Sequence, residues 1–266
     1  MSRGDGASRR PWGERRRTAP HVLEAAAEAP TAEAPADDVA AAPVAGERYG
    51  SFWRPADVSA AMLSILSNDD TELFEQSGRA QAEALVALLP SADATVVDLG
   101  CGIGRVAKYL APRCKLLWGV DVSAEMLEMA AERLAGIPNV RFSHCADTRI
   151  PEIADASVDF VYAVLVLQHL EREDTFLMLR EIRRILRPGG TAYLGFPNLL
   201  SDVYLRSFVA YAESGEAATN PVRARAYTPQ EVERLLPAAG LTVVTLEATV
   251  DIVAVVVRNR VPEERD

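Results

Sequence analysis

The sequence predicts an α/β protein with a mostly parallel sheet and helices on both of its faces. Apolar, β-branched runs alternate with amphipathic helical patterns along most of the chain. The runs are short and continuously apolar, which is typical of strands buried on both sides. The last two runs, at 241–247 and 252–258, are separated by four residues. This spacing indicates a β-hairpin, so one strand near the C-terminus is expected to run antiparallel to its neighbours.

The individual elements follow from these patterns. Earlier strands are expected at 94–99, 115–120, 140–143, 158–165 and 191–196. Helical patterns lie between several of them, notably at 123–135 and 172–187. The second helix is expected to stop at Pro188-Gly189-Gly190, because proline and glycine end helices. The segment 228–231, Thr-Pro-Gln-Glu, has the pattern of a capping box with proline at the first helical position. That helix is expected to end at Gly240.

Composition excludes several classes of protein. The 266 residues are 49% hydrophobic and 25% charged, as in an ordinary globular protein. No apolar run approaches the roughly 18 residues that a membrane-spanning helix needs. The net charge of −10 disfavours a nucleic-acid binder, because an acidic surface repels phosphates. Cys101, Cys114 and Cys145 contain no C-x-x-C pair, so neither a disulfide framework nor a zinc ribbon is predicted. Reduced cysteines, no metal and a cytoplasmic location are the expectation.

The chain is expected to divide into a tail and one domain. Residues 1–48 are first rich in arginine and then in alanine, glutamate and proline, which predicts a disordered, solvated tail. The arginines could also mark a targeting or nucleic-acid segment, although no apolar signal-peptide region follows them. Residues 49–266 are predicted to form the domain, with a substrate-side insertion near 198–226. The insertion carries an aromatic stripe at helical spacing, namely Tyr204, Phe208 and Tyr211. This stripe could belong to a lid and face a substrate, or it could pack in the core.

A glycine-rich loop is the sharpest local signal. In VVDLGCGIGR, residues 96–105, a buried strand is followed by Gly100, Gly102 and Gly104 and then by the start of a helix near Arg105. Glycine permits a tight turn and lets a ligand approach the main chain closely. Ligands of open α/β sheets bind beyond the carboxyl ends of the strands, which is where this loop lies.

Aspartates at successive strand ends narrow the class of ligand. Asp98, Asp121 and Asp147 fall at or just after three expected strands. Each could be only a turn former or a helix cap. Together they favour an adenosine-containing ligand, because Asp121 could accept hydrogen bonds from ribose hydroxyls and Asp147 from an adenine amino group. The G-x-G-x-G spacing is one residue shorter than the dinucleotide fingerprint, and the phosphate-binding G-K-[ST] motif is absent. A ligand without pyrophosphate therefore fits better.

At this point the sequence resembles a known family. VVDLGCGIGR, GVDVSAEML, CADTRIP, VDFVYAVLVLQHL, LRPGG and YTPQEVERLLPAAG are together similar to the class I S-adenosylmethionine-dependent methyltransferases, over roughly residues 70–258. The resemblance implies a Rossmann-like, doubly wound, seven-stranded sheet and S-adenosyl-L-methionine as cofactor. The positions it implies for the cofactor are Asp98, Gly100, Cys101, Gly102, Gly104 and Arg105 around the methionyl part, Asp121 at the ribose, Val122, Met126, Ala146, Asp147 and Thr148 around the adenine, and Val164 on the reactive side.

Other candidate residues are less constrained by the pattern. Arg79 could pair with the cofactor's carboxylate or be an ordinary surface arginine. His169 is the candidate general base, because its pKa class suits proton transfer near neutral pH, but a packing role is an alternative. His144 is the weaker candidate, since it lies nearer the adenine side. The aromatic residues Tyr49, Phe52 and Trp53 either cover the cofactor or simply dock the first ordered residues. The arginines that could bind an acidic acceptor, or be merely solvated, are Arg206, Arg223 and Arg225.

The predicted function is methyl transfer from S-adenosyl-L-methionine to an oxygen or nitrogen atom of a small molecule. No nucleic-acid or membrane partner is expected. A cofactor-binding regulatory or scaffolding protein without methyl transfer is the alternative from another class. A protein or lipid acceptor also remains open. A nicotinamide-dependent dehydrogenase is disfavoured by the loop spacing and by the terminal hairpin.

Overall fold

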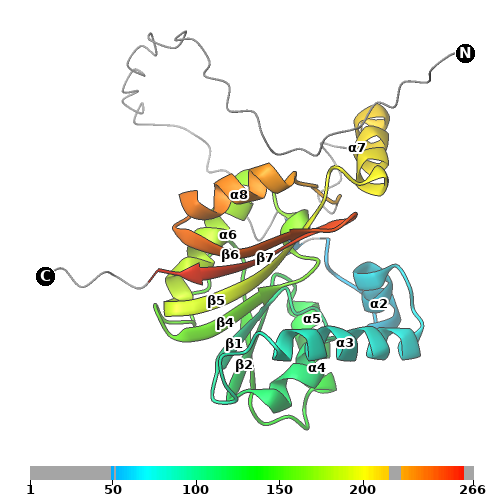
Figure 1. Cartoon of the computed structure of the whole chain (residues 1–266). Coiled ribbons are helices and arrows are strands. Elements are labelled where there is room, and N and C mark those ends of the chain that lie inside the picture. Colours follow the sequence, from blue (N-terminus) through cyan, green and yellow to red (C-terminus); the bar gives the residue numbers. More distant parts are fainter. Residues whose placement is uncertain (1–48, 51, 216–222, 261–266) are drawn as a thin grey trace, which may run out of the picture. The chain divides into compact units, whose positions relative to one another are not determined.

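The computed structural model describes residues 49–50, 52–215 and 223–260, all within the compact unit Ala41–Asp266. These residues form a seven-stranded sheet in the order β3-β2-β1-β4-β5-β7-β6 (Figure 1). The strands are β1 (Thr95–Leu99), β2 (Leu116–Asp121), β3 (Val140–His144), β4 (Val158–Ala163), β5 (Leu186–Pro197), β6 (Leu241–Ala248) and β7 (Ile252–Asn259). Strands β1 to β5 are parallel, and β7 runs antiparallel to both β5 and β6. The predicted doubly wound sheet with an antiparallel C-terminal hairpin is therefore confirmed.

Helices cover both faces of this sheet (Figure 1). They are α2 (Val58–Leu66), α3 (Thr71–Val86), α4 (Ala107–Leu110), α5 (Ala124–Arg133), α6 (Arg172–Ile185), α7 (Asp202–Ser214) and α8 (Pro229–Ala238), with short 3-10 turns η1 (Ala111–Arg113) and η2 (Leu167–His169). Neighbouring strand residues belong to opposite cores, because side chains alternate across a strand. Val96 packs with the α3, α4 and α5 side, whereas Val97 packs with the α6 and α8 side. Both faces are buried, as the continuous apolar runs predict.

The sheet order reverses between β1 and β4, and this reversal determines where a ligand can bind. From β1 the chain proceeds outward to β2 and β3, then returns to β4 on the other side of β1. The loops after β1 and β4 therefore diverge to opposite faces and leave a crevice at the carboxyl edge of the sheet. The glycine-rich loop follows β1, so the fold positions it at this crevice.

The junction between α6 and β5 differs from the expectation. The helix ends at Ile185, and the segment Pro188-Gly189-Gly190 lies inside β5 rather than in a stop after the helix. Val158 pairs with Leu186 but Phe160 pairs with Thr191, so the intervening residues of β5 form a bulge. Gly189 has a φ of 82°, a value that favours glycine, and this allows the strand to bulge without strain.

The C-terminal part of the fold follows the sequence closely. Thr228 and Glu231 form the predicted capping box at the start of α8, with each side chain bonded to the other's main-chain N–H. The helix ends just before Gly240, whose φ is 84°. The predicted hairpin forms as β6 and β7.

The predicted aromatic stripe lies on α7, but α7 has no buried residue, and Phe208 is 59% exposed. The stripe is therefore not part of the core. The predicted tail and residues 216–222 of the predicted insertion lie outside the described residues. Among the described helices, none has the length and apolar character needed to cross a membrane.

Candidate functional site

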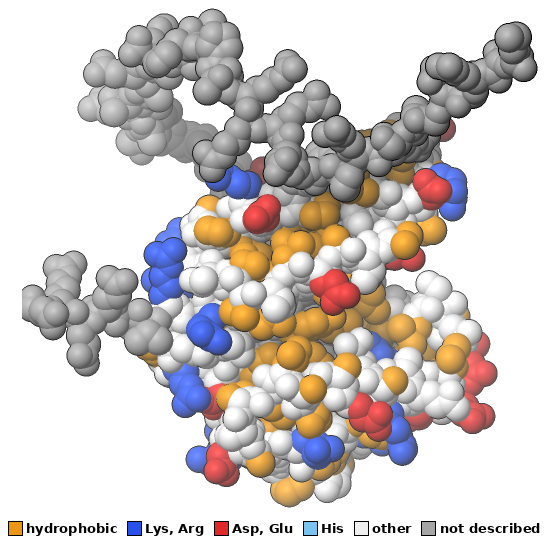
Figure 2. Space-filling model, in the orientation of Figure 1, with side chains coloured by type: hydrophobic (Ala, Val, Ile, Leu, Met, Phe, Trp, Pro, Cys, Tyr) orange, Lys and Arg blue, Asp and Glu red, His pale blue; other side chains and the backbone are white. Residues whose placement is uncertain are grey.

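A cleft opens where the strand order reverses, with about 1150 Å³ of empty space, part of it open to solvent. Of the predicted site positions, the following line it: Asp98, Gly100, Cys101, Gly102, Arg105, Asp121, Val122, Met126, Ala146, Asp147, Thr148, Val164 and His169. Most of these residues lie at or just after the ends of β1 to β4, while Met126 lies on α5 and His169 in η2, so the topology unites positions that lie far apart in the chain. On the face drawn in Figure 2, hydrophobic side chains form a band across the middle of the molecule.

The glycine loop is held tightly against neighbouring elements. The N–H groups of Gly100 and Cys101 both donate to the Val120 carbonyl, at 2.7 and 3.0 Å. Gly100 has a φ of 70°, and a Cβ atom there would lie 2.2 Å from Val166 Cγ2. Gly102 has a φ of 51°, and its Cβ would lie 2.9 Å from Ile65 Cδ1. The main chain at these positions can be approached closely only because both residues are glycine.

Gly104 differs from the other two glycines. It does not appear in the cleft lining, and a Cβ atom there would lie 2.5 Å from Leu134 Cδ1. Its φ is 78°, so glycine is required for the turn itself. Gly104 therefore brings the loop close to the end of α5, and a place beside the ligand stays a prediction for this residue.

Asp121 connects the glycine loop to the following strand. One carboxylate oxygen accepts the Gly102 N–H at 2.8 Å, and the other accepts the Ser123 N–H at 3.0 Å. Burial raises the pKa of Asp121, while hydrogen bonds from the Ser123, Gly102 and Val122 N–H groups act in the opposite direction. A carboxylate can accept about four hydrogen bonds. Asp121 therefore has acceptor capacity left for donors that enter the cleft, such as a pair of sugar hydroxyls.

Asp98 lies deeper, at the end of β1, and it is only 5% exposed. Burial raises the pKa of Asp98 to about 7, while the neighbouring Tyr162 hydroxyl and Arg105 guanidinium act in the opposite direction. The Tyr162 hydroxyl lies near this carboxylate but outside ordinary hydrogen-bond geometry, and among the described residues it has no other partner. Arg105 is 7% exposed and donates to the Ser77 hydroxyl at 3.2 Å. The cleft floor thus combines a carboxyl group that ionises near neutral pH, one cation and a polar hydroxyl.

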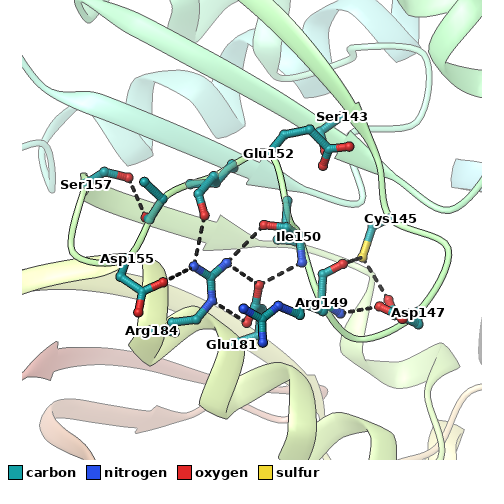
Figure 3. A network of polar contacts seen from close by, with 12 residues as sticks. Ser143, Cys145, Asp147, Arg149, Ile150, Glu152, Asp155, Ser157, Glu181 and Arg184 are labelled. Carbon is teal, nitrogen blue, oxygen red and sulfur yellow. Dashed lines mark hydrogen bonds and ion pairs between the residues drawn. The ribbon is translucent and has the colours of Figure 1, made fainter.

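Asp147 lies on the loop between β3 and β4, and a buried ion pair shapes this loop (Figure 3). Glu181, on α6, accepts the Ile150 N–H at 2.7 Å and forms an ion pair with Arg184 at 2.6 Å. Arg184 in turn donates to the Ile150 and Ile153 carbonyls, each at 2.9 Å. Charge-assisted hydrogen bonds of this kind are stronger than neutral ones. Glu181 and Arg184 therefore hold the loop that carries Ala146, Asp147 and Thr148.

The Asp147 carboxylate itself is exposed. It accepts the Arg149 N–H at 2.6 Å, an Asx-type turn contact. The Asp147 carbonyl accepts from the Cys145 thiol at 2.8 Å, and burial raises the pKa of Cys145 to about 12. Cys145 is therefore a protonated donor that fixes the loop, and all three cysteines are free and buried. The exposed Asp147 carboxylate therefore lies at the rim of the cleft, where it can accept a hydrogen bond from a polar group of a ligand.

His169 lies at the other side of the cleft, in the turn η2 that follows β4. The Gln168 amide nitrogen is 3.1 Å from His169 Nε2. In this orientation the amide donates and Nε2 accepts, so the lone pair of Nε2 is engaged by Gln168. The Trp53 ring meets the imidazole edge to face, with 4.9 Å between ring centroids. Tyr49 and Trp53 line the cleft, whereas Phe52 is 50% exposed.

Buried contacts fix the segment around His169. The Tyr49 hydroxyl donates to Asp174 at 2.5 Å and accepts the Glu171 N–H at 2.9 Å. Arg225 is 6% exposed and donates to the Glu171 carboxylate at 2.5 and 3.0 Å and to the His169 carbonyl at 2.9 Å. The role predicted for Arg225, binding of an acidic acceptor or solvation, is therefore corrected: this arginine positions the His169 segment.

Other predicted candidates also lie outside the cleft lining. Arg79 is exposed on α3, with its guanidinium 5.1 Å from the centroid of the Tyr109 ring. Arg105 lines the cleft and Arg79 does not, which favours the alternative that Arg79 is an ordinary surface arginine. His144 is exposed, and its Nε2 lies 2.9 Å from the Val122 carbonyl. Phe208 and its neighbours on α7 do not line the cleft either.

Sequence reasoning missed several lining residues. Ser64 and Ile65 reach the cleft from α2, and Leu165 and Val166 follow β4. The apolar residues carry no chemical signal that separates them from core positions. The loop-holding pair Glu181 and Arg184 was also missed, although its i, i+3 spacing on a helix indicates an ion pair.

The fold and the cleft are those that the resemblance to the class I S-adenosylmethionine-dependent methyltransferases leads one to expect. Residues 96–190 match the family described as methyltransferase domain. The matched stretch runs from β1 into β5 and includes the glycine loop, Asp121, Asp147 and His169. The match therefore covers the part of the chain that forms most of the cleft.

Known proteins agree with this match over similar stretches. The chain is 42% identical over 120 residues to a trans-aconitate 2-methyltransferase of Azoarcus sp. (strain BH72), which is 44% of this chain and 44% of the relative. It is 36% identical over 123 residues to a malonyl-[acyl-carrier protein] O-methyltransferase of Marinomonas sp. (strain MWYL1), covering 44% and 43%. The chain thus spans less than half the length of these two relatives. The structure of the N-methyltransferase NodS from Bradyrhizobium japonicum WM9 superposes with a TM-score of 0.56 at 22% identity, covering 81% of this chain and 99% of that one.

Proposed function

We propose that the protein transfers a methyl group from S-adenosyl-L-methionine to an oxygen or nitrogen atom of a small molecule. The observation that carries this proposal is the continuity of one cleft, in which the glycine loop, Asp121 and Asp147 share a single space with His169. When bound, the cofactor supplies a methyl group already activated by a sulfonium charge. The protein's task is then to align an acceptor and exclude water.

The described residues fit this cofactor. At the left-handed glycines 100 and 102 a Cβ atom would collide with Val166 and Ile65, so the loop can pack this closely beside the cleft only because both residues are glycine. The unpaired Tyr162 hydroxyl and the Asp98 carboxylate offer polar partners at the cleft floor for an amino acid moiety. Asp121 would accept from the ribose hydroxyls, and Asp147 from the adenine amino group. Val122 and Met126 would pack against the adenine ring, with Ala146 and Thr148 beside it.

Asp98 is expected to make cofactor binding dependent on pH. Because its pKa in the folded protein is about 7, Asp98 is neutral below that pH and ionised above it. An ionised carboxylate favours the cofactor's ammonium group, so affinity for S-adenosylhomocysteine should rise about tenfold from pH 6 to pH 8. Calorimetric titration at several pH values measures this change.

The Asp98→Asn variant is the control for this prediction. It should bind S-adenosylhomocysteine more weakly at pH 8 and lose most of the pH dependence. A pH dependence of binding that persists in the variant would show that another group causes it.

The raised pKa of Asp98 also affects stability. It makes the folded state bind more protons than the unfolded state between about pH 4 and pH 7, so Asp98 makes the apoprotein less stable as the pH rises through that window.

His169 is the residue proposed to receive a proton from a hydroxyl acceptor. His169→Ala should lower turnover by about a hundredfold, the range of general base catalysis, and change the affinity for S-adenosylhomocysteine less than about twofold. Turnover and calorimetric affinity together measure the two effects. The matched control is His144→Ala, because His144 lies outside the cleft lining and should leave turnover unchanged. Equal turnover of His169→Ala and the wild type would reduce His169 to a packing role.

The alternative is a protein that binds the cofactor for regulation or scaffolding, without methyl transfer; protein and lipid acceptors are further alternatives. A methyl-transfer assay across a library of small-molecule hydroxyls and amines separates these readings. Mass spectrometry of the products should detect addition of one methyl group to at least one acceptor. If the chain binds S-adenosylmethionine and yet methylates none of the small molecules, the small-molecule proposal fails. The result would then favour a regulatory or scaffolding protein, or a protein or lipid acceptor.

A further inference from the structure

Leu165 has an unusual backbone conformation for its residue type. Its φ is 62°, in the left-handed region, and it lines the cleft directly after β4. Among the described residues the other non-glycine positions with positive φ are Ser67 and Ala156, a helix cap and a turn residue outside the cleft lining. A side chain in this region costs about 1–2 kcal/mol relative to glycine. Strain of this kind concentrates at functional sites, where the surrounding structure maintains it.

The part of the cleft around Leu165 is apolar. The segment 164–170 contributes Val164, Leu165, Val166, His169 and Leu170, and the N-terminal part of the domain adds Tyr49 and Trp53, which contact this region at Glu171 and His169. The carboxylates of the lining come instead from the ends of β1, β2 and the loop after β3. The cleft thus has a charged part, which the proposed cofactor would occupy, and an apolar part next to His169.

Cations near this apolar part are already paired. Arg225 is bonded to Glu171 through two of its nitrogens, and Arg172 forms an ion pair with Glu231 at 3.0 Å. In the lining that the structure describes, Arg105 is the single arginine or lysine, and it lies near the Asp98 carboxylate. An acceptor carboxylate in the apolar part would lose its hydration without gaining a partner. Such a loss costs several kcal/mol.

We propose that the acceptor is an uncharged, apolar small molecule around the atom that receives the methyl group, and that Leu165 is the specificity-determining residue that packs against it. The proposal rests on the proposed function, because it assigns the charged part of the cleft to the cofactor. The acceptor would then be a hydrophobic alcohol, phenol or amine.

Binding to the full-length protein saturated with S-adenosylhomocysteine tests this proposal without requiring turnover. Calorimetry first measures S-adenosylhomocysteine alone; failure at this step removes the proposed function rather than the acceptor class. Fluorescence titration then compares 2-naphthol, 3-hydroxy-2-naphthoate and 3-hydroxy-2-naphthamide. The acid and the amide are similar in shape, so their comparison isolates charge. We expect the naphthol and the amide to bind at least about tenfold more tightly than the acid.

Two variants test the role of Leu165. Leu165→Gly removes the strain and the side chain, whereas Leu165→Asn keeps a residue that tolerates a left-handed φ but replaces the apolar surface. Both should weaken 2-naphthol binding about tenfold, the effect of losing one buried leucine contact, with S-adenosylhomocysteine affinity unchanged. Leu165→Gly should also unfold at the wild-type temperature or above it.

The control variant is Leu63→Ala, at a residue that is 47% exposed and not in the lining; it should leave both affinities unchanged. The proposal would be overturned if the acid binds tightly, or if the amide is excluded together with the acid. It would also be overturned if 2-naphthol does not bind, or if both Leu165 variants bind 2-naphthol with wild-type affinity.

Discussion

Replacing Gly100 by alanine is expected to destabilise the domain and to abolish measurable cofactor binding. A Cβ atom at this position would lie 2.2 Å from Val166 Cγ2 and 2.9 Å from Val166 Cγ1, far inside van der Waals contact. The φ of 70° adds a left-handed strain of about 1–2 kcal/mol. With the overlap included, the free energy of unfolding should fall by about 2–4 kcal/mol. Urea denaturation measures the loss of stability, and calorimetry with S-adenosylhomocysteine measures the loss of binding.

Two further variants separate the causes of this effect. Gly100→Ala combined with Val166→Ala removes the overlap but not the backbone strain, so it should recover part of the stability. Gly136→Ala is the matched control, because no heavy atom lies within 4 Å of the added Cβ and its φ is not positive. That variant should stay within about 0.5 kcal/mol of the wild type. Wild-type stability of Gly100→Ala would show that the loop after β1 does not pack as described.

Replacing Asp121 by alanine should weaken binding of S-adenosylhomocysteine by about ten- to a hundredfold. Hydrogen bonds to a charged group contribute about 1.5–3 kcal/mol each, and the variant loses those to the ribose. It also releases the Gly102 N–H, which Asp121 accepts at 2.8 Å, so the glycine loop loses one of its anchors. Asp121→Asn keeps one acceptor oxygen at the same position and should have an intermediate affinity. Calorimetric titration distinguishes the three proteins.

The control for Asp121 is its neighbour in the same loop. The Ser123 hydroxyl caps α5 by accepting the Met126 N–H at 3.0 Å. Ser123→Ala should cost about 1 kcal/mol of stability through the lost cap, with little change in affinity. If Ser123→Ala weakens binding as much as Asp121→Ala does, general loosening of the loop explains the effect, and the ribose assignment fails.

Local patterns were sufficient to predict the strands that are buried on both faces and the capped helix. The capping box of Thr228 and Glu231 is visible within four residues of sequence. The burial of Val96 and Val97 on opposite faces of the sheet follows from a continuous apolar run. The glycine loop and Asp121 were likewise identified because strand ends and glycine spacing are visible in the sequence. These features depend on neighbours in the chain, not on the fold.

Features that depend on distant partners could not be predicted. The run 158–165 looks like a single strand, yet β4 ends at Ala163 because the main chain turns and Leu165 adopts a positive φ, which apolar periodicity does not encode. Arg225 finds its partner Glu171 54 residues away, so its burial is a tertiary effect. The same holds for Arg79, since helical periodicity does not show that its guanidinium lies over the ring of Tyr109 on α4.

A crystal structure of the full chain with S-adenosylhomocysteine tests the central claim most directly. The account predicts density for one molecule along the carboxyl ends of β1 and β2, with the ribose hydroxyls within hydrogen-bonding distance of Asp121 and the sulfur directed toward Val164. A cleft that stays empty at saturating ligand, or that holds the molecule with its ribose away from Asp121, would contradict it.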